Sequence, residues 1–283
     1  MSKIKPLVFT GFNNSWLDFD DSNLDIAIAQ VKELQKINIP IVPISFRTFA
    51  EIRESLCSLG IIKECLFSLG AIDPIVVEYG SAIILQSDRA DFDTPDTETE
   101  GDFAIYKLGC TYIEARAVLK VIQSTLRINN LRGFGDLDEA ELASLTDMSL
   151  AEIKQVKTRK YSEMFVNPKS VSVAEMAATA EEFGCKIVEG EGISTLLGAE
   201  ASITESINYL CSGYKAGNAI AFGIGNSKQD LEMLQAVDKP IWFGEPEKLD
   251  PYLESRCQVT SSNDLAGWIE AINIVLDESI KVD

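Results

Sequence analysis

Short β-prone runs alternate with helical stretches at both ends of this 283-residue chain, and this alternation restricts the fold more than any other feature. The β-prone runs are rich in apolar or β-branched residues, and the helical stretches carry apolar residues about three to four positions apart. The runs are residues 7–9, 39–44, 74–79, 81–85, 219–223 and 240–243, and the helical stretches are residues 25–36, 48–59, 228–237 and 263–276. Strands that alternate with helices of this length predict an α/β fold with a doubly wound parallel sheet.

The alternation stops after residue 86. Residues 88–102 are acidic and interrupted by a proline and a glycine, which predicts a solvated connecting loop. The stretch that follows mixes strand and helix patterns, and Ser149 with Glu152 forms a capping-box signature at the start of one helix. We therefore expect one core domain and an inserted α+β cap domain. The expected core comprises residues 1–86 and 192–283, and the expected cap comprises residues 87–191.

The composition excludes several classes of function. The chain has no histidine, which removes histidine-activated nucleophiles and histidine metal ligands. Its six cysteines form no C-x-x-C pair, a pattern typical of buried reduced thiols. A net charge of −19 argues against binding to nucleic acid or anionic membranes. No long apolar segment or export signal is seen, so we expect a cytoplasmic protein without membrane insertion.

Five short segments stand out at the predicted strand ends and helix starts. They are the strand L-V-F-T followed by G-F-N-N-S-W-L-D at 7–18, S-F-R-T-F-A-E at 45–51, E-Y-G-S at 78–81, R-K-Y-S-E-M at 159–164, and G-I-G-N-S-K-Q-D-L-E-M-L at 223–234. In this order the segments resemble the haloacid dehalogenase (HAD) superfamily and, within it, the mannosyl-3-phosphoglycerate phosphatase family. The resemblance covers most of the chain. It implies a HAD-like core with an inserted cap, and a magnesium-dependent phosphatase ancestry.

The catalytic positions of that family are altered in this chain. The resemblance places Gly11 at the attacking aspartate and Asn13 at the aspartate that acts as general acid and base. Gly11 and Asn226 replace the two carboxylates expected to bind Mg²⁺, so only Asp230 of the acidic set remains. A glycine has no nucleophilic side chain, and an amide has no useful proton to transfer. The phosphatase reaction is therefore expected to be lost.

The family's phosphate-binding lysine is also missing. The matching stretch is residues 198–205, and no lysine lies between Lys186 and Lys215. Ser202 and Glu205 instead form a capping-box pattern at the start of the next helix. The helix start is thus expected to survive without its positive charge.

Some residues of the former site are retained. Ser45 and Arg47 could bind an anion, although Ser45 has no histidine to activate it and is better suited to donate a hydrogen bond to a ligand or a strand end. Tyr161, Ser162 and Glu163 match the family's substrate-facing cap segment, or else form an ordinary strand. Ligands of such sheets bind at the carboxyl ends of the strands. The remains of the site should gather there, beneath the cap, and they comprise Gly11, Asn13, Ser45, Asn226 and Asp230.

These observations lead us to expect a catalytically inactive phosphatase homologue with a binding, regulatory or assembly role and no cofactor. One alternative is a sugar-phosphate phosphatase of the mannosyl-3-phosphoglycerate phosphatase type, which would need Mg²⁺. Another is a sensor that binds a sugar phosphate without cleaving it. We expect a protein partner, with a sugar phosphate as the other candidate ligand. Trp16 either fills the emptied site or packs under the cap.

Overall fold

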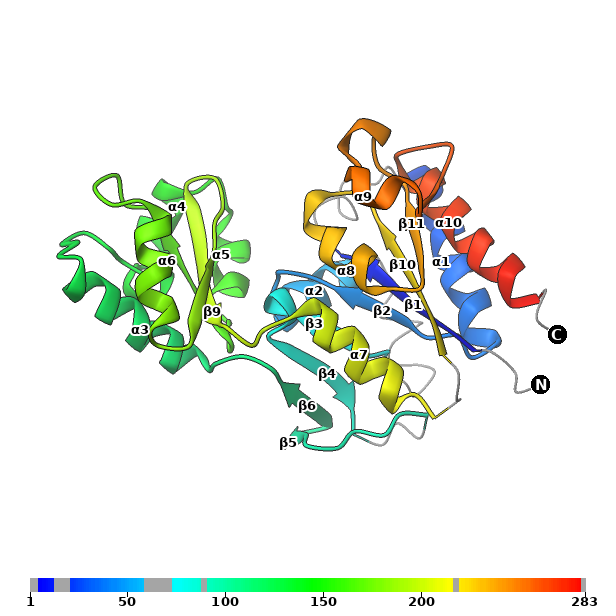
Figure 1. The fold of residues 1–283 in the computed structure, drawn as a ribbon, viewed down its shortest axis with the longest axis horizontal. Coiled ribbons are helices and arrows are strands. Elements are labelled where there is room, and N and C mark those ends of the chain that lie inside the picture. Colours follow the sequence, from blue (N-terminus) through cyan, green and yellow to red (C-terminus); the bar gives the residue numbers. More distant parts are fainter. Residues whose placement is uncertain (1–4, 13–20, 59–72, 88–90, 216–218, 281–283) are drawn as a thin grey trace.

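The computed structural model describes residues 5–12, 21–58, 73–87, 91–215 and 219–280. A nine-stranded sheet runs through the core, and helices cover both of its faces (Figure 1). The strand order is β12 (Gln258–Val259), β11 (Lys239–Trp242), β10 (Ala219–Gly225), β1 (Lys5–Gly11), β2 (Ile41–Ile44), β3 (Ile75–Val77), β4 (Ala82–Gln86), β6 (Phe103–Lys107) and β5 (Glu98–Glu100). The six strands from β12 to β3 are parallel, and β4, β6 and β5 extend the sheet in antiparallel fashion. The predicted α/β fold with a large parallel sheet is confirmed.

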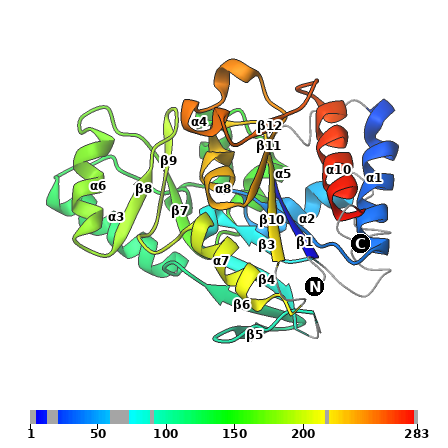
Figure 2. The ribbon, with the colours of Figure 1, turned by 45° about the vertical axis from the view of Figure 1, so that its right-hand side comes forward.

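The alternating side chains of β1 show how the two faces are filled. Val8 points into a cluster with α1 (Asp21–Lys36), α2 (Phe49–Ser58) and α10 (Leu265–Ile280). Leu7 and Phe9 point into the opposite cluster with α7 (Ile203–Gly213), α8 (Leu231–Ala236) and α9 (Pro251–Glu254). Side chains alternate across a strand, so a strand covered on both sides must be apolar throughout, as β1 is. Figure 2 shows α1 and α10 side by side on their face.

The cap is built on a separate antiparallel sheet. Its strand order is β7 (Ser162–Val166), β9 (Ile193–Gly198) and β8 (Cys185–Val188). The helices α3 (Tyr112–Thr125) and α6 (Val173–Glu181) pack on one apolar cluster, and α4 (Glu139–Leu145) and α5 (Leu150–Val156) on another. The capping box predicted at Ser149 and Glu152 is confirmed at the start of α5.

The strand pairing places the ends of the insertion differently from the expected boundaries at residues 87 and 191. Strands β5 and β6 pair with β4 in the core sheet, although they lie after residue 87. Strand β9 belongs to the cap sheet, although it lies after residue 191. Part of the predicted loop at 88–102 is the exposed edge strand β5, whose alternation of charged and polar residues gives no apolar signal. The division of the chain into two independently folding domains stays a prediction.

Short 3-10 helices complete the fold: η3 (Glu78–Gly80) follows β3, η4 (Phe134–Asp136) precedes α4, η5 (Lys228–Asp230) precedes α8, and η6 (Pro246–Lys248) precedes α9. None of the helices in the described ranges has the length and apolar character needed to cross a membrane.

Trp268 joins the closing helix to the central strand and offers a test of this packing. Its side chain is buried, and its Nε1 donates to Thr10 Oγ1 at 3.2 Å. We expect Trp268→Ala to lower the free energy of unfolding by about 3–5 kcal/mol, because it leaves a large cavity in the core. Chemical denaturation measures the change, with Tyr252→Ala as the control because Tyr252 is 87% exposed. A loss below about 1 kcal/mol would contradict this placement of α10.

Candidate functional site

The carboxyl ends of three neighbouring parallel strands bring most of the predicted site residues together. Gly11 ends β1, Ser45 follows β2, and Asn226 follows β10. Asp230 ends η5, and its carboxylate contacts both Asn226 and the position of Gly11. These residues therefore lie together at the edge of the sheet that the carboxyl ends of the parallel strands form. Asn13 and Trp16 lie outside the described residues.

Asp230 occupies the place from which a side chain at position 11 would project. A Cβ atom at Gly11 would lie 2.0 Å from Asp230 Oδ1 and 2.6 Å from its Cγ. Real Cβ atoms do not approach other atoms so closely, since the contact is far inside van der Waals distance. An aspartate at position 11 would therefore require Asp230 to move.

Hydrogen bonds hold the Asp230 carboxylate in this place. Its Oδ2 accepts from the backbone N–H groups of Asn226 and Ser227 at 3.0 Å each, and from Ser227 Oγ at 2.7 Å. The Asp230 side chain is only 3% exposed. A buried carboxylate is costly unless it is hydrogen-bonded in this way. Asp230 thus closes the turn between β10 and α8.

Mg²⁺, which the family resemblance implies for active relatives, requires several hard oxygen ligands. At this edge Gly11 has no side chain, Asn226 has a neutral amide, and Asp230 Oδ2 already accepts three hydrogen bonds. These described residues do not fit a Mg²⁺ site. Nowhere else in the described ranges do three or more acidic or cysteine side chains gather in a way that could hold a metal ion.

Ser45 acts within the protein, as a link between two strand ends. Its Oγ donates to the carbonyl of Phe12 at 2.6 Å and accepts from the backbone N–H of Arg47 at 3.2 Å. The Ser45 side chain is buried. Arg47 is half-buried and donates to Ser55 Oγ at 3.5 Å. Of the two roles expected for Ser45, the structure shows the bond to a strand end.

Ser202 is the N-cap residue of α7, at the predicted helix start, but the predicted capping box with Glu205 is only half formed because the Ser202 N–H donates to the Gly80 carbonyl. Its Oγ accepts from the backbone N–H of Glu205 at 3.1 Å. A carboxylate from α8 completes the cap, because Glu232 Oε1 accepts from the N–H groups of Ile203 at 2.9 Å and Thr204 at 3.1 Å. Helix N-termini attract anions. The place where the family resemblance implies a phosphate-binding lysine therefore already holds a negative charge.

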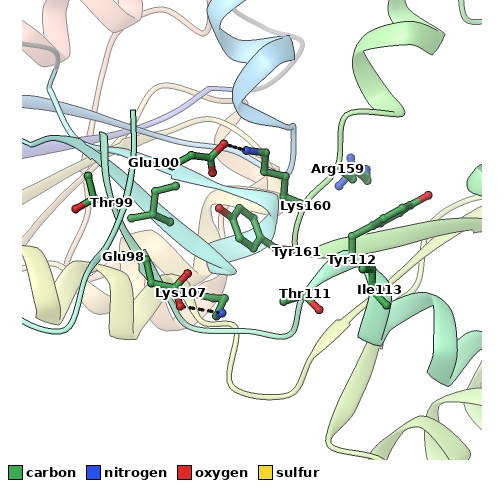
Figure 3. A pocket seen from close by; sticks show the side chains of 11 residues that line it. Glu98, Thr99, Glu100, Lys107, Thr111, Tyr112, Ile113, Arg159, Lys160 and Tyr161 are labelled. Atoms are coloured by element: carbon green, nitrogen blue, oxygen red, sulfur yellow. Dashed lines mark hydrogen bonds and ion pairs between the residues drawn. The ribbon is translucent and has the colours of Figure 1, made fainter. Parts of the chain in front are cut away.

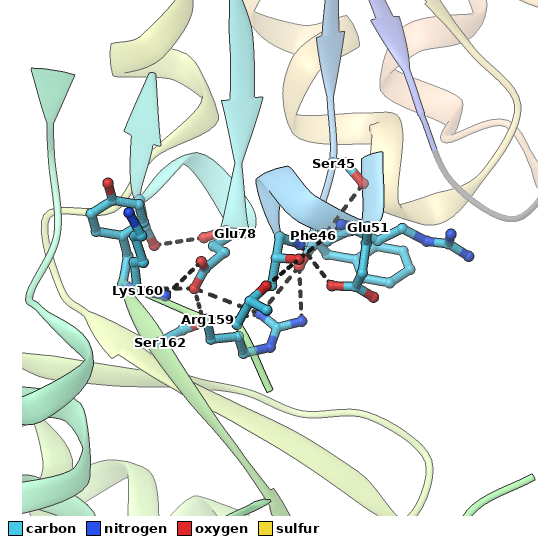
Figure 4. Close-up of polar contacts among 12 residues, drawn as sticks. Ser45, Phe46, Glu51, Glu78, Arg159, Lys160 and Ser162 are labelled. Carbon is cyan, nitrogen blue, oxygen red and sulfur yellow. Dashed lines mark hydrogen bonds and ion pairs between the residues drawn. The ribbon is translucent and has the colours of Figure 1, made fainter. Parts of the chain in front are cut away.

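Glu78 joins the cap to the core through a buried network (Figure 4). One Glu78 oxygen accepts from the backbone N–H of Lys160 at 3.0 Å. The other accepts from the N–H of Tyr161 at 3.2 Å and from Ser162 Oγ at 2.6 Å. Arg159 lies beside them, with its Nη1 atom 3.8 Å from Glu78 Oε2. Two of the three cap residues predicted to face the substrate thus take part in holding the cap to the core.

Arg159 extends the network to the loop after β2. Its guanidinium donates to the carbonyl of Phe46 at 3.2 Å and to Ser162 Oγ at 2.9 Å. The charge of Arg159 favours the ionised phenol of Tyr79, but burial is the larger effect and raises the pKa of Tyr79.

Sequence reasoning assigned no role to Glu78 or Arg159. The signal was a pair of opposite charges within two otherwise matched segments, 78–81 and 159–164.

Glu163, the third predicted cap residue, is held inside the cap. Its Oε1 accepts from the backbone N–H of Gly135 at 2.9 Å and lies 4.0 Å from Arg116 Nη1. Burial raises the pKa of this carboxyl, while the hydrogen bond from Gly135 and the charge of Arg116 oppose the rise. Its role in the structure is to fix the loop of η4 against β7.

An open hollow of about 500 Å³ lies between the β5–β6 hairpin and the cap (Figure 3). Tyr161 lines it, together with the ion pairs that Lys160 forms with Glu100 and Lys107 with Glu98. A smaller hollow of about 190 Å³ also has Lys160 and Tyr161 in its lining. None of the residues from the carboxyl ends of β1, β2 and β10 lines either hollow. Neither of these two hollows therefore contains both Tyr161 and a strand-end residue.

The contact between position 11 and Asp230 can be tested by stability. We expect Gly11→Ala to lower the free energy of unfolding by about 1–3 kcal/mol, because its Cβ overlaps Asp230 Oδ1. In an Asp230→Ala background the same change should cost less, so the two substitutions should be non-additive by at least about 0.5 kcal/mol. Gly109→Ala is the matched control, since the nearest atom to its Cβ would lie at 3.4 Å. Additive costs in chemical denaturation would contradict the contact.

The comparisons with known proteins agree with this architecture. No family model matches the chain. The chain is 25% identical to a glucosyl-3-phosphoglycerate/mannosyl-3-phosphoglycerate phosphatase of Persephonella marina, an alignment that covers 96% of this chain and 97% of that protein. It is also 25% identical to a protein of the same description from Methanococcoides burtonii, with 88% of each chain covered.

Solved structures show the same fold at lower sequence identity. A HAD-superfamily phosphatase from Bacteroides thetaiotaomicron superposes with a TM-score of 0.63 at 14% identity, with 96% of each chain covered. A HAD subclass IIB sugar phosphatase gives a TM-score of 0.59 at 12% identity, with 96% of this chain and 99% of that chain covered. The chain has the fold of the HAD superfamily and is a homologue of the glucosyl-3-phosphoglycerate/mannosyl-3-phosphoglycerate phosphatases.

Proposed function

We propose that this chain has lost the phosphatase reaction of its relatives and acts as a non-hydrolysing protein with a binding or regulatory role. The observation that carries this proposal is the position of Asp230 Oδ1, 2.0 Å from where a Cβ atom would lie at Gly11. The reaction of a HAD phosphatase needs a carboxylate at the end of the first strand to attack phosphorus. In this chain that position has no side chain, and its space is filled from another element.

The surroundings of Asp230 support the same proposal. A substitute nucleophile must reach the phosphorus atom, yet Asp230 is 3% exposed and its Oδ2 accepts three hydrogen bonds. The leaving oxygen also needs a proton donor, and Asn13 stands where the family resemblance implies one. Neither Asp230 nor Asn13 is therefore suited to its half of the reaction.

The N-terminus of α7 argues further against binding of a phosphate group in the manner of the relatives. Glu232 Oε1 accepts from two backbone N–H groups there. A phosphate approaching this helix end would meet the like charge of Glu232 at short range, which is unfavourable, although water screens the repulsion because Glu232 is exposed. The phosphate would have to displace Glu232 to use these donors.

A sugar-phosphate phosphatase is the second candidate, and two observations favour it. The relatives named for this activity match nearly the whole chain. Asp230 Oδ1 also lies 2.0 Å from where a Cβ atom at position 11 would be, so Asp230 is the candidate to replace the missing nucleophile. Such a reaction would depend on Asp230 and would require it to leave its buried position.

An activity assay separates the two candidates. We expect no release of phosphate from mannosyl-3-phosphoglycerate, glucosyl-3-phosphoglycerate or an aryl phosphate in the presence of Mg²⁺, because the attacking group is missing. The measurement is phosphate release by the purified full-length chain, compared with a mock purification and with Asp230→Asn. Turnover that exceeds the mock preparation and disappears in Asp230→Asn would overturn the proposal and establish the second candidate.

The proposed binding role has two candidate ligands, a protein partner and a sugar phosphate, and a titration distinguishes them. The net charge of −19 favours a protein partner with a basic surface. Calorimetric titration with mannosyl-3-phosphoglycerate tests the sugar-phosphate sensor, and heat that saturates at millimolar ligand would establish it in place of the protein partner.

A further inference from the structure

Two cysteines of the cap lie where the chain enters it and returns from it. Cys110 follows β6 on the connection from the core into the cap. Cys185 begins β8, where it pairs with Gly198 at the end of β9. Gly198 directly precedes the connection back into the core, which leads to α7. The two thiols are therefore close to both connections, although 75 positions separate them in the sequence (185 − 110 = 75).

The strand pairing directs the two side chains toward each other. Directly paired residues of antiparallel strands point their side chains to the same face of the sheet. A Cβ atom at Gly198 would lie 2.4 Å from the backbone nitrogen of Cys110, so Cys110 covers Gly198 on that face. The side chain of Cys185 points to the same face, beside Gly198. Cys110 thus lies over the position next to Cys185.

The packing and hydrogen bonding of the thiols agree with this geometry. Cys185 is buried within an apolar cluster of the cap, and Cys110 packs against the same cluster from its partly exposed edge. Each thiol changes the pKa of the other, as side chains in close proximity do. Cys110 Sγ also lies 3.8 Å from the carbonyl of Tyr161. No third acidic or cysteine ligand joins this pair in the described ranges, so it does not form a metal site.

The two thiols differ in acidity. The interaction with Cys185 raises the pKa of Cys110, and burial raises it further. The interaction with Cys110 lowers the pKa of Cys185, although burial and the charge of Glu114 act in the opposite direction. Cys185 is therefore the more acidic thiol of the pair. Thiolates are the reactive form of cysteine toward oxidants.

We propose that Cys110 and Cys185 are a modification site, at which hydrogen peroxide forms a reversible disulfide across the base of the cap. The Cys185 thiolate attacks one peroxide oxygen and breaks the O–O bond, giving a sulfenic acid and releasing the other oxygen as water after it takes up a proton. The Cys110 sulfur then attacks the sulfenic sulfur, loses its proton and releases the second water. Two thiols are oxidised by two electrons in total, and one peroxide is reduced to two waters.

The disulfide would restrain the connection between the cap and the core. Gly109, directly before Cys110, lies beside Ala201 of the return connection, since a Cβ atom at Gly109 would be 3.4 Å from the Ala201 Cβ. A bond from Cys110 to β8 would tie the first connection to the strand that pairs with the end of β9. The orientation of the cap would then be fixed by a covalent bond in addition to the Glu78 network. This inference does not rest on the proposed function.

Peptide mapping of the oxidised full-length protein tests the site. The protein is fully reduced, desalted, treated with hydrogen peroxide, alkylated and digested without reductant. We expect a cross-linked peptide containing Cys110 and Cys185, which dithiothreitol converts back to two free thiols. Cys110→Ser and Cys185→Ser should abolish it, whereas Cys211→Ser, at a half-buried thiol of the core, should retain it. The midpoint of thermal unfolding should rise on oxidation of the wild type and stay unchanged in Cys110→Ser.

Two results would overturn the proposal. One is that both thiols remain alkylatable, or oxidise only to separate sulfinic acids, at peroxide levels that oxidise the half-buried Met148 and Met164. The other is that Cys110 or Cys185 pairs with a different cysteine in the folded protein. The map of the wild-type protein decides between these outcomes even where a serine variant fails to fold.

Discussion

The arrangement of the candidate site depends on the contact between the Asp230 carboxylate and position 11 at the end of β1. Its Oδ1 lies where a side chain at position 11 would begin, and its Oδ2 closes the turn that leads into α8. Because Asp230 is buried, loss of these hydrogen bonds would destabilise the folded protein. A glycine at position 11 and an inward-facing Asp230 are therefore mutually dependent. Asp230 is thus part of the buried hydrogen-bond network in this structure.

The second constraint is the buried charge network between cap and core. Glu78 begins η3 directly after β3 of the core sheet, and Arg159 lies on the connection that leads into β7 of the cap sheet. The two residues are 1% and 6% exposed. Their hydrogen bonds engage the backbone of Lys160 and Tyr161, the side chain of Ser162 and the carbonyl of Phe46. Removing one partner of such a network leaves the other charge buried and unpaired, which is strongly unfavourable. The cap is thus held to the core by charges that a substrate-binding face would be expected to leave accessible.

Local patterns in the sequence predict the fold well, and the site only in part. The alternation of strands and helices predicts the sheet because burial on both faces requires apolar runs such as β1. The capping pair Ser149 and Glu152 is local and is confirmed. The β5 strand was missed because its side chains are exposed, so its pairing with β6 depends on backbone hydrogen bonds that composition does not reveal. The roles of Ser162 and Glu232 were missed because their partners lie 84 and about 30 positions away along the chain.

The proposed loss of the phosphatase reaction implies that no group of this chain forms a covalent bond to phosphorus. Intact-protein mass spectrometry detects such a bond, after the full-length protein is incubated with Mg²⁺ and a reactive phosphoryl donor such as acetyl phosphate and quenched in acid. We expect a single species with the mass of the unmodified chain. A species heavier by one phosphoryl group, which is absent in Asp230→Asn, would contradict it, because it would show that Asp230 has replaced the missing nucleophile.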